Sequence, residues 1–97
     1  MKFEKNKIAY YFSENKSINR IFLFGSYARN EETEESDIDL LLELNDEEKT
    51  DLFDFIGWKI DLEKLLNKKV DLVTTDGLSK FVKPFVDTDK KLIYEKR

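Results

Sequence analysis

The sequence contains no cysteine and no histidine. The absence of cysteine excludes disulfide bonds and thiolate chemistry, and the absence of histidine excludes imidazole metal ligands and a histidine general base. No apolar run approaches the roughly 20 residues of a membrane-spanning helix, so we expect no membrane association. Any chemistry must therefore depend on carboxylates, hydroxyl groups, lysines and arginines.

Residues that interrupt helices and strands are also scarce, since the 97 residues include one proline and three glycines. We find no linker or repeat and predict a single domain over residues 1–97. The N-terminal stretch Met1-Lys2-Phe3-Glu4-Lys5 lacks the apolar region of a signal peptide, which favours a cytoplasmic protein. The net charge of −4 disfavours broad electrostatic capture of nucleic acid, so we expect no direct nucleic-acid contact.

The apolar pattern predicts alternating helices and strands. The helices are predicted over residues 5–16, 51–67 and 78–86, with one helical turn over 26–30, and the strands over 18–24, 37–44 and 70–74. Residues 91–94 fit either a helix end or an edge strand. This alternation indicates an α/β (α+β) fold, in which helices flank a small mixed β-sheet.

The longest predicted helix begins after Thr50 or Asp51, either of which can cap its N-terminus. We expect Trp58 to lie in the core. The side chains predicted to form the core-facing stripe of this helix are Leu52, Phe53, Ile56, Ile60, Leu62, Leu65 and Leu66.

Three aspartates occupy predicted strands, where apolar residues are the norm. Asp37 and Asp39 are spaced i, i+2 and therefore point to the same side of a strand. Asp71 lies between Val70 and Leu72. Aspartate is disfavoured in strands and is costly to bury unless it is paired or bound to metal. The three carboxylates thus predict a site for one or two Mg²⁺ ions, because hard cations prefer oxygen ligands; solvated aspartates at strand ends are the alternative.

The sequence contains a second Asp-x-Asp pair that serves as a control. Asp87 and Asp89 have the same spacing, but they lie in a hydrophilic segment beside Lys90 and Lys91. We interpret this second pair as a solvated turn. The spacing alone is therefore a weak signal. Asp37 and Asp39 differ from the second pair because they lie at the start of an apolar strand.

A glycine–serine turn precedes the first carboxylate pair. Gly25 and Ser26 end an apolar strand, and such a turn can offer backbone N–H groups and a hydroxyl to a phosphate. Arg29 lies one helical turn later and can contact the same phosphates. The alternatives are a helix N-cap for Ser26 and a surface ion pair with residues 31–35 for Arg29.

These motifs together resemble the signature of the DNA polymerase β-type nucleotidyltransferase superfamily. The pattern is Gly25-Ser26, ten residues, then Asp37-x-Asp39. The fuller runs Gly-Ser-Tyr-Ala-Arg and Ser-Asp-Ile-Asp-Leu-Leu-Leu-Glu resemble its smallest branch, the minimal nucleotidyltransferases. Val70-Asp71-Leu72-Val73 is similar to the strand of that branch that carries the third carboxylate. Asn30 departs from the pattern, because many relatives have glycine after the arginine.

The resemblance implies a nucleotidyltransferase fold, ATP as substrate and a protein partner. Members of this branch are commonly encoded beside HEPN-domain toxins, and characterised members act as antitoxins by transferring AMP to a tyrosine of the toxin. By this resemblance Asp37, Asp39 and Asp71 are the catalytic metal ligands, and Gly25, Ser26 and Arg29 bind the nucleotide. A hetero-oligomer with the toxin is expected.

Two other functions fit the same residues. The protein could be a non-catalytic antitoxin that blocks the toxin by binding alone. It could also transfer a nucleotidyl group to a small-molecule acceptor. Replacement of Asp37 and Asp39 separates the first of these from catalysis, because blocking by stoichiometric binding does not need the carboxylates.

Overall fold

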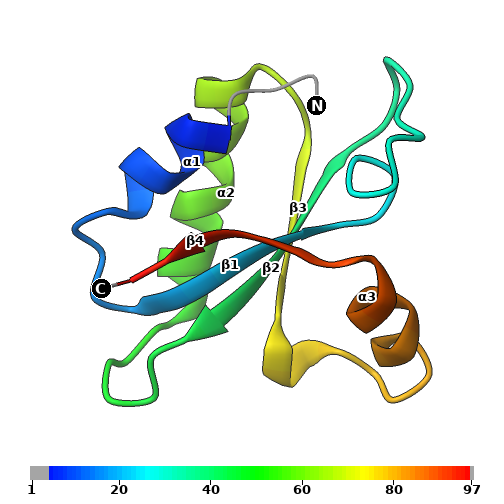
Figure 1. Ribbon diagram of the computed structural model, residues 1–97. Helices are drawn as coiled ribbons and strands as arrows, with labels where there is room; N and C mark the ends of the chain where they lie inside the picture. Colours follow the sequence, from blue (N-terminus) through cyan, green and yellow to red (C-terminus); the bar gives the residue numbers. More distant parts are fainter. Residues whose placement is uncertain (1–4, 97) are drawn as a thin grey trace.

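The computed structural model describes residues 5–96 and contains a small sheet with helices packed on it (Figure 1). The elements are α1 (Lys5–Phe12), β1 (Ile18–Phe24), β2 (Ile38–Leu44), α2 (Leu52–Leu66), β3 (Val70–Thr74), the 3₁₀ turn η1 (Thr75–Gly77), α3 (Lys83–Asp89) and β4 (Lys91–Glu95). The helices within residues 5–96 are too short or too polar to cross a bilayer.

The four strands form one mixed sheet in the order β3-β2-β1-β4. β1 is antiparallel to both β2 and β4, whereas β2 and β3 are parallel and are joined by α2. The predicted mixed sheet with flanking helices is confirmed. Residues 91–95 form an edge strand, which resolves the alternatives that the sequence left for this segment.

One face of the sheet is covered by α1 and α2, which lie side by side in Figure 1. Alternate strand residues point to this face, because side-chain direction alternates along a strand. The buried side chains of this core include Ile8, Phe12, Ile18, Ile21, Leu23, Ile38, Leu40, Leu42, Trp58, Leu62, Val70 and Leu72. Each large apolar side chain contributes about 1.5–3 kcal/mol on full burial, so this face holds the strands in one register.

The core-facing stripe of α2 differs from the predicted one. Trp58 and Leu62 are buried, and Phe55 and Leu66 pack against the same cluster. Five side chains of the predicted stripe are exposed: Leu52, Phe53, Ile56, Ile60 and Leu65. The prediction was wrong because this helix carries apolar residues on more than one side, and only the stripe at helical spacing from Phe55 meets the sheet.

Two predicted helices have different ends in the structure. α1 stops at Phe12, because residues 13–16 form turns that lead into β1. The helix predicted over 78–86 instead spans Lys83–Asp89. Pro84 lies in its first turn, where the missing N–H of proline leaves no hydrogen bond unmade. The proline therefore starts this helix and does not interrupt it.

Candidate active site

Asp39 and Asp71 lie directly opposite each other on the face of the sheet that α1 and α2 leave uncovered. The parallel pairing of β2 with β3 aligns Asp39 with Asp71, just as it aligns Leu40 with Leu72 on the covered face. Asp37 was predicted to begin this strand but precedes β2 by one residue, because the strand starts at Ile38. The structure thus brings two of the predicted carboxylates into direct register and places the third beside the same strand.

The ends of α2 fix the register of β3 and so the position of Asp71. Asp51 caps the helix: its side chain accepts a hydrogen bond from the Asp54 backbone N–H, while Asp54 accepts one from the Asp51 backbone. Asn67 ends the helix in the left-handed conformation, with φ 54°. The Ile38 N–H then donates to the Lys69 carbonyl at 2.9 Å, which joins the starts of the two parallel strands.

Gly25 lies against the carboxylate of Asp39. Antiparallel pairing of β1 with β2 aligns Phe24 with Asp39, and Gly25 follows at φ 76°, where glycine is favoured. A Cβ atom at this position would lie 2.2 Å from Oδ2 of Asp39. Glycine is therefore favoured at position 25 for two reasons: its left-handed backbone conformation, and the room that its missing side chain leaves for the carboxylate.

The pKa of Asp39 is raised to about 6, chiefly because burial disfavours its charged form. Repulsion by Asp71 and then by Asp37 adds to the shift, and the positive charge of Arg29 opposes it. The other two predicted carboxylates and the predicted arginine therefore all act electrostatically on Asp39. Their charges converge on Asp39, which is the least exposed of the three aspartates.

The turn after Gly25 is hydrogen-bonded but is not a helix. The N–H groups of Ala28 and Arg29 both donate to the Gly25 carbonyl, at 3.0 and 3.2 Å. No helix follows Ser26 in residues 26–30, so the helix N-cap alternative for its hydroxyl is wrong. Asn30 has φ 60°, a left-handed conformation that suits glycine and that asparagine tolerates. The departure at Asn30 is therefore compatible with the turn.

Arg29 makes the surface ion pair that was its alternative role, and a second one that the sequence did not predict. Its Nε donates to Glu31 at 3.0 Å, and its Nη1 donates to Asp89 at 2.5 Å. The Asp89 side chain is only 18% exposed. The interpretation of Asp89 as part of a solvated turn was wrong, because positions 29 and 89 are 60 residues apart and no local pattern links them.

The donor chemistry of the site fits Mg²⁺, since carboxylate oxygens are the ligands this ion prefers. Within residues 5–96, no three acidic side chains are already gathered in an arrangement that would hold a metal ion. Asp39 and Asp71 repel each other from register-matched positions. A cation between them would remove that repulsion, so the residues fit the ion although their side chains are not closed around it.

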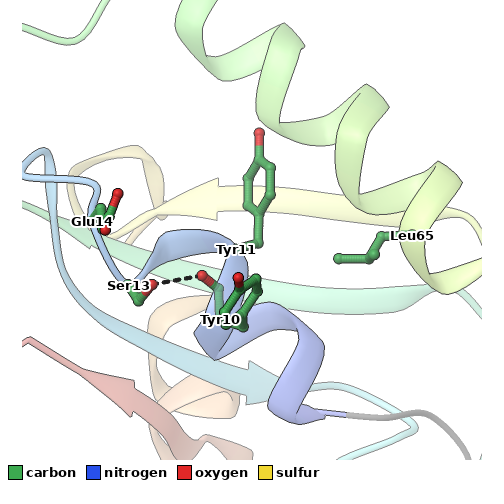
Figure 2. A pocket seen from close by; sticks show the side chains of 5 residues that line it. All are labelled: Tyr10, Tyr11, Ser13, Glu14 and Leu65. Carbon is green, nitrogen blue, oxygen red and sulfur yellow. Dashed lines mark hydrogen bonds between the residues drawn. The ribbon is translucent and has the colours of Figure 1, made fainter.

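Two hollows near the sheet differ in their relation to this site. One, of about 400 Å³, lies where the end of α1 meets α2 and is lined by Tyr10, Tyr11, Ser13, Glu14 and Leu65 (Figure 2). It contains none of the predicted site residues. The other, of about 320 Å³, opens beside Asp37 and is lined also by Lys68 and Lys69. The lining of the second hollow therefore carries both signs of charge, since Glu34 and Glu35 also belong to it.

The chain is similar to known nucleotidyltransferases. The family described as Polymerase beta, Nucleotidyltransferase matches residues 6–97. A protein of Methanocaldococcus jannaschii named "Putative protein adenylyltransferase MJ1379" is 41% identical over 78 residues, which cover 79% of this chain and 76% of that protein.

Two solved structures have a similar fold. A chain of a toxin–antitoxin crystal structure with AMP-PNP has a TM-score of 0.81 and 26% identity, with 97% of this chain and 75% of that chain covered. The other belongs to a complex of a tri-AMPylated HEPN toxin from Shewanella oneidensis with an MNT antitoxin. Its TM-score is 0.70 at 26% identity, with 95% of this chain and 70% of that chain covered.

Proposed function

Because this chain belongs to the polymerase beta nucleotidyltransferase family, we propose that it is an antitoxin that transfers AMP from ATP to a tyrosine of a HEPN toxin. The observation that carries the proposal is the alignment of Asp39 with Asp71 on the uncovered face of the sheet, next to Gly25. The AMP-PNP bound in one similar complex and the AMPylated toxin in the other support the choice of nucleotide and acceptor.

The metal ligands of the proposed enzyme are Asp37, Asp39 and Asp71, which would hold one or two Mg²⁺ ions. When bound, Mg²⁺ supplies positive charge that offsets the charge of the triphosphate and the charge that develops during transfer. Asp39 would be the most sensitive of the three ligands, because it is partly buried and faces the other carboxylates.

The nucleotide is held by Gly25, Ser26 and Arg29 in this proposal. The hydroxyl of Ser26 carries no hydrogen bond to any of residues 5–96, and Ser26 follows the glycine that lies against the carboxylate of Asp39. Arg29 adds a guanidinium group, whose planar set of donors matches phosphate oxygens. These three residues would orient the phosphates beside the carboxylates.

The reaction is a displacement at the α-phosphorus of ATP. In this proposal Asp71, which is exposed and belongs to β3, accepts the proton of an incoming tyrosine hydroxyl. The phenolic oxygen then forms a bond to the α-phosphorus as the bond between this phosphorus and the bridging oxygen breaks. Pyrophosphate leaves with that oxygen and its electron pair, and AMP remains attached to the tyrosine.

The proposal also covers the organisation and location of the protein. The uncovered site lies on the surface of one small domain, so a docked partner would have to present the acceptor tyrosine and complete the site. A hetero-oligomer with the toxin follows. Since ATP is the substrate in this proposal and is abundant in the cytoplasm, we propose that the protein acts there.

The direct test is incubation of the purified protein with ATP, Mg²⁺ and the HEPN protein encoded beside it. We expect the toxin to gain the mass of one AMP group, or of a few, on tyrosine, as measured by mass spectrometry of the intact protein and its peptides. Omission of Mg²⁺ or addition of a chelator is expected to stop the transfer.

Variants at the carboxylates separate the enzyme from a protein that only binds. Replacement of Asp37 and Asp39 together by asparagine is expected to abolish transfer, whereas Asp76→Asn, at an exposed position beyond β3, should leave it unchanged. If the toxin stays unmodified but is still inhibited, and the double variant inhibits equally well, the protein is a non-catalytic antitoxin. If AMP appears on a small molecule and not on the toxin, the acceptor in the proposal is wrong.

A further inference from the structure

The α3–β4 junction approaches the candidate active site through one ion pair. Asp89 is the last residue of α3, and its carboxylate accepts a hydrogen bond from Nη1 of Arg29 at 2.5 Å. Arg29 belongs to the turn that follows β1, so this contact joins two segments far apart in the chain. α3 itself is anchored by Val86, which is 3% exposed. The position of Asp89 is therefore set by the packing of α3 and not by a freely moving side chain.

The two carboxylates that contact Arg29 differ in burial. The side chain of Glu31 is 64% exposed, whereas that of Asp89 is 18% exposed. Exposed ion pairs are screened by water and hold long side chains weakly, while partly buried pairs are screened less. Glu31 is also two residues away in the same turn, so it can move together with Arg29. Asp89 is thus the contact that fixes the guanidinium relative to the sheet.

The guanidinium of Arg29 keeps donors available in this position. Its hydrogen bonds to Glu31 and Asp89 use Nε and Nη1, and Nη2 carries no hydrogen bond to any of residues 5–96. Arginine has five N–H donors in a rigid planar group, so two carboxylates occupy only part of it. The backbone N–H of Arg29 donates to the Gly25 carbonyl at 3.2 Å, and Gly25 lies against the carboxylate of Asp39, so Arg29 belongs to the turn beside the carboxylates. A phosphate oxygen could therefore bind Nη2 without displacing Asp89.

We propose that Asp89 is a positioning residue for the nucleotide: it holds Arg29 with its free edge toward the phosphates. The proposal rests on the proposed function, because it assumes that a nucleotide binds beside Gly25. An arginine that is already ordered loses less side-chain freedom when it binds phosphate, which raises affinity without any direct contact between Asp89 and the nucleotide. Without the ion pair, the negative charge of Asp89 would repel the triphosphate. Asp89 can therefore raise nucleotide affinity only while it is paired with Arg29.

The chain supplies a matched control in Asp87. This residue lies in the same helix, two positions earlier, and its carboxylate pairs with Lys83 at 2.7 Å and with Lys90 at 3.1 Å, not with Arg29. Asp87→Asn and Asp89→Asn remove the same charge from the same segment. A general effect of negative charge on nucleotide binding would therefore appear in both variants, and with the same sign.

The experiment measures the affinity of the full chain for AMP-PNP with Mg²⁺ by calorimetry. We expect Asp89→Asn to weaken binding by about fivefold to tenfold, as for a partly buried charge pair, and Asp87→Asn to change it by less than about twofold. Asp89→Glu should restore part of the affinity, because it keeps the charge. The melting temperature of each variant shows whether it is folded.

A double-mutant cycle with Arg29 tests how Asp89 acts. In an Arg29→Ala background, Asp89→Asn should no longer weaken nucleotide binding. The proposal is overturned if the two asparagine variants behave alike, if Asp89→Asn binds more tightly than the wild type, or if its effect is unchanged in the Arg29→Ala background. A wild-type chain that binds no AMP-PNP at all would instead contradict the proposed function, and this inference with it.

Discussion

The two faces of the sheet are built from the same strands but have opposite chemistry. On the face covered by α1 and α2, Leu40 and Leu72 lie in register and are buried in the core. One residue earlier on the same strands, Asp39 and Asp71 lie in register on the uncovered face. Alternation along each strand therefore places an apolar pair and a carboxylate pair back to back.

This difference shows that the core determines the geometry of the site. A shift of one residue between β2 and β3 would bury carboxylate under the helices and expose leucine, which would strongly reduce the free energy of unfolding. The apolar face thus makes the carboxylate pairing obligatory. The other face also buries an apolar side chain, Leu41, but at its carboxylates the fold has to tolerate a repulsion.

The largest effect is expected on the uncovered face from Asp39→Asn. Loss of this ligand should reduce AMP transfer by at least about a thousandfold, or about 4 kcal/mol in activation free energy. The fold should be as stable as the wild type or more stable, because a half-buried, repelled charge is removed. Initial rates and denaturant unfolding measure the two effects. Transfer within tenfold of the wild type would show that Asp39 is not a ligand.

The opposite result is expected from the neighbouring Leu40→Ala. Removal of this buried side chain should lower the free energy of unfolding by about 2–5 kcal/mol. The folded fraction should bind AMP-PNP nearly as the wild type does, since the carboxylates keep their positions. Urea unfolding and calorimetry are the measurements. A loss of nucleotide affinity in fully folded protein would mean that the two faces are not separable.

Gly25→Ala tests the contact between the turn and Asp39. A methyl group in a left-handed conformation, 2.2 Å from Oδ2, should destabilise the protein by about 1–3 kcal/mol. It should also weaken nucleotide binding by moving the carboxylate. The control is Gly57→Ala in α2, where a Cβ would meet nothing within 4 Å, and which should stabilise the protein by about 0.5–1 kcal/mol. Equal effects of the two variants would contradict this account.

The smallest effect is a pH dependence with opposite signs for stability and for metal binding. The pKa of Asp39 is about 6 in the folded protein and lower in the unfolded chain, near the ordinary aspartate value of 3.8. Between these values the folded state binds more protons, so stability should rise as the pH falls from about 7 to about 4, by about 1 kcal/mol after solvent screening. Mg²⁺ binding should weaken over the same range, because protons compete for the carboxylate.

Asp39→Asn serves as the reference for this titration. The variant lacks the titrating group, so the difference in unfolding free energy between wild type and variant should shrink as the pH falls below 6. Unfolding curves at several pH values measure it. A difference that stays constant across the range would show that Asp39 is not the group responsible.

The sequence was sufficient to predict the strands that carry the site. The apolar runs 18–24 and 70–74 became β1 and β3 with the predicted ends. The run 37–44 became β2, which begins one residue later than predicted and contains Asp39. These segments are predictable because their patterns are short, strongly apolar and bounded by polar residues. The mutual position of Asp39 and Asp71 needed one further assumption, that β2 and β3 are neighbours, which the structure confirms.

Features that depend on tertiary packing were not predictable. The buried side of α2 depends on which of its apolar stripes meets the sheet, and the pattern alone favoured the wrong residues. The pairing of Arg29 with Asp89 depends on where α3 lies. The spacing of the second Asp-x-Asp pair could not predict this contact, because it is the same as the spacing of the first pair. Spacing identifies residues that share a side of one element, but not the element that faces them.

The central claim, that Asp39 and Asp71 share a cation on the uncovered face, is tested most directly with Mn²⁺ in place of Mg²⁺. Titration of the protein with Mn²⁺ in the presence of AMP-PNP, followed by the electron paramagnetic resonance signal of the free ion, measures the site itself. We predict that Asp39→Asn and Asp71→Asn each weaken Mn²⁺ binding by at least about tenfold, while Asp76→Asn does not. If Asp71→Asn bound Mn²⁺ as tightly as the wild type, the two carboxylates would not form one site.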